Sequence, residues 1–226
     1  ETAPKLYEEH QQLWMQWLES EHDNLRVALA WALEHGRIEA GMRIAVALSR
    51  FWEIYSYVQE GLTWFERLFA HEDEEISLPV RVNALSFAAF LAHFLGQTVT
   101  PLAYGRKAVA LAESAGEAGM PLLLMALSGL SSGFEAMGDY QAAFATNERA
   151  LQLLRHALHP QMEQNPKSWS PDDSIMLGMT VLVQGGVAIE LGDYTSAYRY
   201  LEEGLTLAHA ASDPYRIAFS FYFLGN

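Results

Sequence analysis

The chain has 226 residues, of which 50% are hydrophobic and 19% charged, a composition typical of a folded globular domain. Its 28 acidic residues outnumber 14 basic ones and leave a net charge of −14, and no basic run is present, which argues against direct contact with nucleic acid. The absence of cysteine excludes disulfides, thiolate metal sites and a cysteine nucleophile, and it favours a cytoplasmic location.

The sequence predicts a soluble segment of a longer protein. The most apolar window, 175–189, is too short to span a bilayer, so we expect no membrane contact. The chain starts at Glu1 without a methionine or a signal sequence and stops at Asn226 inside an apolar run, so we expect an excised piece.

Apolar periodicity and turn residues predict an all-α fold of about eleven helices with no sheet. In chain order the predicted helices are 5–19, 21–35, 38–54, 58–70, 79–95, 99–115, 121–137, 140–158, 173–191, 194–211 and 214–226.

A recurring turn divides these helices into hairpins. Gly138-Asp139-Tyr140 and Gly192-Asp193-Tyr194 each follow one apolar helix and precede another, and Ser56 and Gly96 begin degenerate copies. Glycine can adopt the left-handed conformation that ends a helix, so Gly138 should have a positive φ, and the aspartate can cap the next helix. The repeat period is about forty residues, with an insertion in the third repeat.

The predicted organisation is a helical pair over 1–36 followed by an array over 37–226, in which stacked hairpins form an α-α superhelix. The repeats are expected at 37–78, 79–119, 120–172, 173–213 and 214–226, the last one truncated. Three prolines predict that the insertion, 159–174, is a loop.

The hairpins resemble tetratricopeptide repeats. The matching positions are Leu127, Leu130, Phe134, Gly138, Tyr140, Ala143 and Ala150. The stretch 17–33, together with 49–52 and 61–68, is similar to the start of the superhelical sensor region in bacterial multidomain regulators of the signal-transduction ATPase (STAND) class, of the maltose-activator/LuxR-like and Streptomyces antibiotic regulatory protein-like kinds. The resemblance implies a domain that follows a nucleotide-binding module, receives an inducer or partner and relieves autoinhibition.

In tetratricopeptide arrays the first helix of each hairpin lines a groove. By that register, the expected groove residues are Arg43, Arg50, Glu53, Asn83, Phe90, His93, Phe94, Ser128, Ser132, Glu135, Glu190 and Tyr222. Trp169 in the inserted loop is expected at the rim. Mixed charge with aromatics suits a protein, a peptide or a small polar inducer. An empty solvated groove is the alternative, because a solenoid exposes one face of each helix in any case.

Three further patterns have structural explanations. Gly129–Gly133 matches G-x-S-x-G, but it falls within a predicted helix rather than a strand-to-helix turn, so helix packing explains it. His156, His159 and Glu163 have the spacing of metal ligands, but Pro160 ends the predicted helix between them. The aromatic residues of the first four helices should form a core, namely Trp14, Trp17, Trp31, Phe51, Trp52, Trp64 and Phe65.

The sequence therefore favours a non-enzymatic sensor or scaffold domain of a cytoplasmic bacterial transcriptional regulator or signalling ATPase, with no catalytic residue, metal or cofactor. Its expected partners are a protein, peptide or small inducer in the groove and the other domains of the same regulator. A peptide-pheromone sensor and a protein-interaction scaffold without a small ligand are the alternatives. The identity of the ligand does not follow from the sequence.

Overall fold

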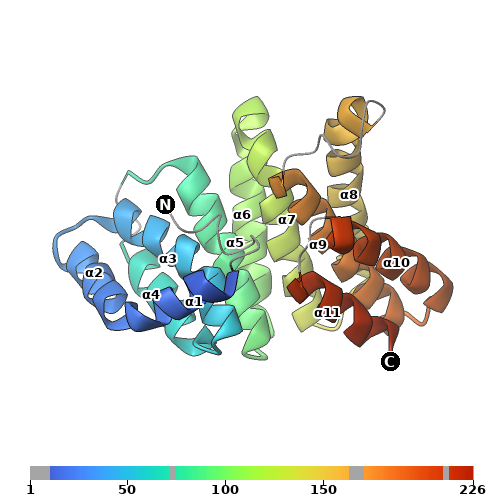
Figure 1. Cartoon of the computed structure of the whole chain (residues 1–226). Coiled ribbons are helices and arrows are strands. Elements are labelled where there is room, and N and C mark those ends of the chain that lie inside the picture. The colour runs from blue at the N-terminus through green and yellow to red at the C-terminus, as the bar shows by residue number, and fades with distance from the viewer. Residues whose placement is uncertain (1–10, 72–74, 163–170, 211–213, 226) are drawn as a thin grey trace. The chain divides into compact units, whose positions relative to one another are not determined.

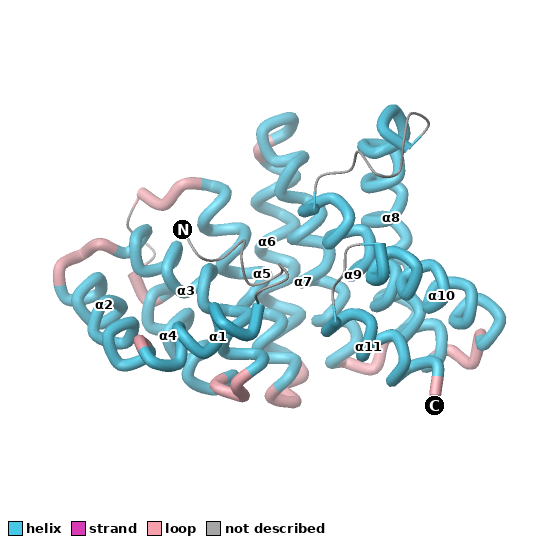
Figure 2. Tube along the Cα trace, in the orientation of Figure 1, coloured by secondary structure: helices cyan, strands magenta, loops and turns pink. Residues whose placement is uncertain are grey.

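The computed structural model describes residues 11–71, 75–162, 171–210 and 214–225. All regular structure in these residues is helical (Figure 1; Figure 2). The helices are α1 (Gln11–Ser20), α2 (His22–Glu34), α3 (Ile38–Ile54), α4 (Val58–Phe69), α5 (Leu78–Phe94), α6 (Val99–Ser114), the 3-10 helix η2 (Gly116–Gly119), α7 (Met120–Ala136), α8 (Tyr140–Met162), α9 (Pro171–Glu190), α10 (Tyr194–Ala210) and α11 (Pro214–Leu224). The predicted all-α fold is confirmed, whereas η2 was not predicted.

The chain divides into two compact units, residues 1–137 and 138–226, and each is described by itself. In unit 1, α3, α5 and α7 pack side by side as a layer of first helices (Figure 1). The second helices pack against this layer, with α4 against α3 and α5, and α6 against α5 and α7. In unit 2, α9 packs against α8 and α10, and α11 packs against both α9 and α10.

Left-handed residues end the helices, as the sequence predicts. The glycines are Gly36, Gly96, Gly116, Gly138 and Gly192, with φ between 57° and 75°. The expected aspartate caps are also present, because Asp139 Oδ1 accepts the N–H of Ala142 and Asp193 Oδ1 accepts that of Ser196, each at 3.1 Å. A tight turn and a cap therefore fix each of these two chain reversals.

One turn achieves the same geometry without glycine. Ser56 has φ 61°, and its N–H donates to Glu53 O at 3.3 Å while the N–H of Tyr57 donates to Trp52 O at 2.8 Å. This pair of bonds is the Schellman pattern that closes a helix end. A side chain in the left-handed region clashes with its own backbone, so Ser56 is strained relative to glycine.

The core of unit 1 is aromatic, but less so than predicted. The buried members of the predicted set are Phe51, Trp52, Trp64 and Phe65. For Trp17 and Trp31 the prediction was wrong, because these side chains are 47% and 52% exposed. Helix α2 faces the core with Leu29 and Ala32, which are buried, and this orientation turns Trp31 outward.

Glycines let the backbones of α6 and α7 approach closely. A methyl group on Gly105 would lie 2.5 Å from Leu130 Cα, and one on Gly133 would lie 2.5 Å from Leu102 Cα. Real side chains do not approach backbone atoms that closely, so only glycine fits at these positions. The Gly129–Gly133 stretch therefore lies inside α7 and serves helix packing, as the sequence analysis predicts.

The predicted loop over 159–174 was wrong at both ends. Helix α8 continues to Met162, and α9 begins at Pro171. Proline fixes φ near the helical value, so Pro160 costs one backbone hydrogen bond close to the helix end without reversing the chain, and proline is favoured at the first position of a helix. Residues 163–170 lie outside the described residues.

We predict that Ser56→Gly raises the free energy of unfolding by about 0.5 to 1 kcal/mol, because it removes left-handed strain at a partial cost in chain entropy. The matched change, Gly138→Ser at φ 72°, should lower it by a similar amount, and Gly138→Val should lower it by about 1 to 2 kcal/mol. Urea unfolding followed by circular dichroism measures all three. A loss of stability in Ser56→Gly would contradict the strain assignment.

Candidate functional site

Most of the expected groove residues lie on the first-helix layer of unit 1. Helix α3 carries Arg43, Arg50 and Glu53, α5 carries Asn83, Phe90, His93 and Phe94, and α7 carries Ser128, Ser132 and Glu135. Glu190 is the last residue of α9 and Tyr222 lies on α11, so both belong to unit 2. Trp169 lies outside the described residues. That these side chains form one ligand site stays a prediction.

Arg43 takes part in a contact between α3 and the start of α5. Its guanidinium lies 2.6 Å from Glu39 Oε1, and the Glu39 carboxylate accepts both the N–H and the hydroxyl of Ser77, each at 3.0 Å. The bond from the Ser77 N–H, followed by that from Arg43, lowers the pKa of Glu39. Since Ser77 immediately precedes α5, Glu39 helps to fix where that helix begins.

Arg50 is buried rather than exposed on the layer. Its side chain is 7% exposed, and Nη1 donates to Glu53 Oε2 at 2.7 Å. Separating this pair would leave the charge of a buried arginine uncompensated, which costs free energy. The ion pair within α3 is therefore stable. Arg50 and Glu53 therefore shape the layer more than they offer charge to a ligand.

The solvent face of α5 presents aromatic rings. Asn83, Phe87, Phe90 and Phe94 recur at helical spacing, the first three half-buried and Phe94 57% exposed. The Phe87 and Phe90 ring centroids are 6.3 Å apart, and those of His93 and Phe94 are 6.0 Å apart. The Nδ1 atom of His93 is buried without a hydrogen-bond partner, and burial lowers the pKa of this imidazole. The face thus combines partly exposed apolar rings with an imidazole whose pKa is lowered.

The serines of α7 bond within their own helix. The Ser128 hydroxyl donates to Leu124 O at 3.1 Å, and the Ser131 hydroxyl donates to Glu135 Oε1 at 3.2 Å. Ser132 is buried. These bonds hold the Ser128 and Ser131 hydroxyls against their own helix.

A small hollow opens between α3, α4, α5 and α6, with a volume of about 20 Å³. It is lined by Met42, Phe69, His71, Ile76, Arg81, Leu85 and Lys107. A volume of this size holds about one water molecule. Within the described part of the chain, no three histidine, aspartate or glutamate side chains are placed to hold a metal ion.

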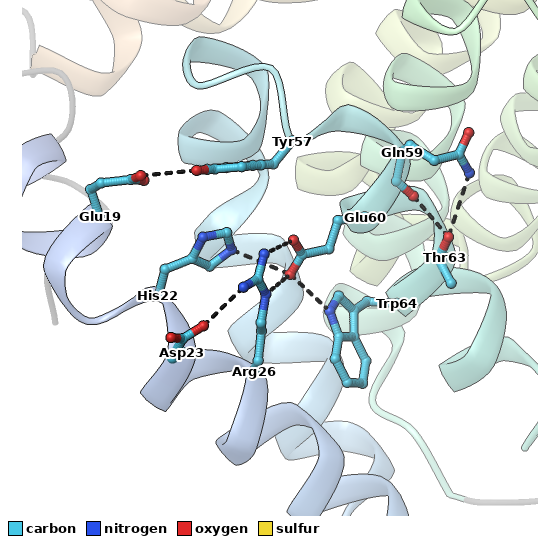
Figure 3. Close-up of polar contacts among 9 residues, drawn as sticks. All are labelled: Glu19, His22, Asp23, Arg26, Tyr57, Gln59, Glu60, Thr63 and Trp64. Carbon is cyan, nitrogen blue, oxygen red and sulfur yellow. Dashed lines mark hydrogen bonds and ion pairs between the residues drawn. The ribbon is translucent and has the colours of Figure 1, made fainter.

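A polar cluster that the sequence analysis missed joins α2 to α4 (Figure 3). Arg26 donates to both oxygens of Glu60, from Nε at 2.8 Å and from Nη2 at 2.6 Å, and its Nη1 donates to Asp23 at 2.9 Å. His22 Nε2 lies 3.2 Å from Glu60 Oε1, and the Trp64 indole N–H donates to the same oxygen at 3.4 Å. Glu60 is therefore the centre of the cluster.

Aromatic rings surround the histidine of this cluster. His22 is buried, and its ring centroid lies 5.0 Å from that of Phe51 and 4.4 Å from that of Tyr57. The Tyr57 hydroxyl donates to Glu19 Oε1 at 2.9 Å, which adds a contact from α1 (Figure 3). Both N-terminal helices are thus tied to the α3–α4 hairpin by polar bonds.

Hydrogen bonding shifts the pKa values of three groups in this cluster. Hydrogen bonds from Arg26 lower the pKa of Glu60 and burial opposes them, while the same bonds raise the pKa of Arg26. The bond to Glu19 raises the pKa of Tyr57. The one available sequence signal was the four-residue spacing of His22 and Arg26 on α2, but Glu60 lies 34 residues beyond Arg26.

Comparisons with known proteins give partial matches. No known protein-family profile matches the chain. It is 31% identical over 144 residues to "Putative HTH-type transcriptional regulator Rv0890c" of Mycobacterium tuberculosis and, at the same identity, to "Putative HTH-type transcriptional regulator Mb0914c" of Mycobacterium bovis. Each match covers 59% of this chain and 16% of the relative, so the chain spans about a sixth of the length of these relatives. The chain is thus an all-helical segment similar to part of proteins named as transcriptional regulators.

Among solved structures, the crystal structure of BtubC from P. vanneervenii aligns with 86% of this chain and 91% of its own, at 16% identity and a TM-score of 0.44. Similarity at that level does not bear on function. No helix in the described ranges has the length and apolar character needed to cross a membrane.

We predict that Glu60→Gln lowers the free energy of unfolding by about 1 to 2 kcal/mol at pH 7, because Arg26 loses its charged acceptor in a partly exposed pair. The pKa of Glu60 in the folded chain lies below its ordinary value of 4.5. Its contribution to the free energy of unfolding is therefore complete above pH 4.5 and is lost as the pH falls through the pKa of the folded chain. Urea unfolding at pH 7 and at pH 3.5, followed by tryptophan fluorescence, measures the difference.

The control for this prediction is Glu66→Gln, an exposed position on the same helix, which should leave stability within about 0.5 kcal/mol of the natural chain. The destabilisation caused by Glu60→Gln should shrink at the lower pH. An effect that is the same at both pH values would show that the carboxylate charge is not what joins α2 to α4.

Proposed function

We propose that this chain is a binding domain of a cytoplasmic transcriptional regulator, and that it acts by binding rather than by catalysis. Its partner in this proposal is a protein or peptide segment that lies on the first-helix layer of unit 1. The observation that carries the proposal is the aromatic solvent face of α5, on which Phe94 is 57% exposed. The similarity to proteins named as transcriptional regulators supports the regulatory context.

The aromatic face supplies the kind of anchor that protein partners use. Rigid aromatic side chains contribute much of the binding energy at interfaces, because they bury large areas and lose few rotamers. Phe90 and Phe94 lie one turn apart on a helix that neighbours support on both sides, so their positions are set before a partner arrives. In this proposal Asn83 bonds the partner's backbone.

The geometry favours a peptide or protein segment over a small inducer. Sites for small molecules are typically enclosed volumes of about 300 to 1,000 Å³. The hollow beside α5 offers about 20 Å³, far below that range. An open layer of helices with exposed rings instead suits a partner that lies across the surface.

The wider architecture belongs to the same proposal. We infer that the hairpins are tetratricopeptide-like and that the chain is the sensor region of a STAND-type regulator, because the left-handed turns recur at the spacing found in the sequence and the chain spans a small part of its relatives. Other domains of the same polypeptide are then natural partners. A peptide-pheromone sensor and a pure scaffold are the competing functions.

We predict that Phe94→Ser, introduced into the gene of the full-length protein, changes the abundance of the regulated transcripts about fivefold or more. Loss of an aromatic anchor weakens a regulatory contact, and coupling energies of that kind typically correspond to changes of about 5- to 150-fold. RNA sequencing of the strain before and after the substitution measures the effect. Because Phe94 is mostly exposed, the fold should be retained, which circular dichroism of the purified chain checks.

The matched control is Val99→Ser on α6, which removes another exposed apolar side chain from the same unit. It should leave the transcripts unchanged.

Placing a photoreactive amino acid at position 94 should give a protein adduct in cells, whereas an adduct of small mass would identify an inducer. Unchanged transcripts in Phe94→Ser, or equal changes in both variants, would refute the proposal.

A further inference from the structure

The outer face of α2 carries an unusual combination of side chains. Val27 and Trp31, four residues apart, are 68% and 52% exposed, whereas Leu29 and Ala32 are buried against unit 1. Figure 1 shows α2 at the edge of that unit. Terminal helices of stacked arrays need a polar outer face for solubility, so two exposed apolar side chains there indicate a surface that a partner covers.

Carboxylates border this apolar pair. Asp23 and Glu34 are exposed and lie one turn before Val27 and about one turn after Trp31, on the same helix. Residues 11–34 contain four carboxylates and one arginine, and that arginine, Arg26, is already bonded to Asp23 and Glu60. The border of the apolar pair thus carries Asp23, which Arg26 already contacts, and Glu34, and the His35 ring stacks on Trp31 with the centroids 4.5 Å apart.

We propose that this outer face of α2 binds an amphipathic helix whose apolar side is flanked by lysine or arginine. Apolar residues of the partner, spaced three and four apart, would pack on Val27 and Trp31, and its basic residues would meet Asp23 and Glu34. The face from Asp23 to Glu34 spans about 16 Å, the length of three helical turns. This proposal is independent of the proposed function, which concerns the first-helix layer.

Charge decides between a basic partner and a second copy of this chain. The chain has a net charge of −14, and two copies that met through this face would bring acidic borders together. Like charges placed opposite each other across an interface disfavour association, whereas a basic helix gains from the same field.

The test uses the 226-residue chain and two fluorescein-labelled peptides of 18 residues. One has leucine at positions i, i+3, i+4 and i+7 with lysine elsewhere, and the other has glutamate in place of lysine. Fluorescence anisotropy at low salt should detect saturable binding of the leucine–lysine peptide and none of the leucine–glutamate peptide. Analytical ultracentrifugation at the same concentrations should find a monomer.

Three variants separate the apolar from the charged contribution. Val27→Asn combined with Trp31→Gln should weaken binding of the leucine–lysine peptide at least tenfold without changing the net charge. Asp23→Asn combined with Glu34→Gln should weaken it about threefold or more. Val99→Asn, at an equally exposed valine on α6, should change it less than twofold. Circular dichroism checks that each variant is folded, and Val27→Asn alone serves if the double variant is not.

Unchanged affinity in the Val27 and Trp31 variants would overturn the proposal, because the peptide would then bind elsewhere on the acidic surface. Equal binding of the leucine–glutamate peptide would also overturn it, since the charge argument would fail. A dimer that dissociates in the Val27 and Trp31 variants would show that the face is covered by a second copy instead.

Discussion

The fold depends on a constraint at the described short turns between its helices, where the chain must reverse direction within about three residues. Such a reversal needs one residue in the left-handed region and backbone bonds that close the last turn. Glycine provides this at most of the reversals, and Ser56 provides it at one, with the same two bonds. Within each unit, consecutive helices pack against each other, and in unit 1 the first helices α3, α5 and α7 become neighbours in one layer.

Close packing then determines what that layer presents to solvent. Gly105 and Gly133 bring the backbones of α6 and α7 together, and the small residues of α5 and α7 do the same within the layer. A helix packed this closely cannot rotate about its own axis to bury its outer residues. Phe90 and Phe94 therefore remain on the solvent side of α5. The aromatic face that we assign to partner binding is thus a consequence of how tightly the small residues pack.

The helices and turns could be predicted from the sequence because their signals are local. Glycine and aspartate at the turns, and apolar spacing between them, act within a few residues of where they stand. The orientation of individual polar and aromatic residues could not be predicted as well. Arg43 and Arg50 share one helix face by spacing, yet Arg43 is exposed and Arg50 is buried beside Glu53.

Longer-range features escaped sequence analysis for the same reason. Glu60 contacts His22 and Arg26 only because α3 and its two turns bring α4 beside α2, and no local sequence pattern predicts that contact. Trp31 belongs to an aromatic set by composition, but Leu29 and Ala32 decide which side of α2 faces the core. The helices and turns therefore follow from local sequence signals, while the residues that each helix presents to solvent are decided by the packing.

The cluster around Glu60 also sets the order in which unit 1 would yield to a mechanical force. Residues 11–34 are attached to the rest of unit 1 through these polar bonds and through the buried side chains of Met15, Leu18, Leu29 and Ala32, whereas glycines bring the backbones of α6 and α7 into direct contact. A pull on the N-terminal helices is resisted first by Arg26 and Tyr57, whose bonds rupture over short distances. Helices α1 and α2 would therefore detach before the aromatic face of α5 is disturbed, and rupture of the Glu60 cluster would be the first step of unfolding under force.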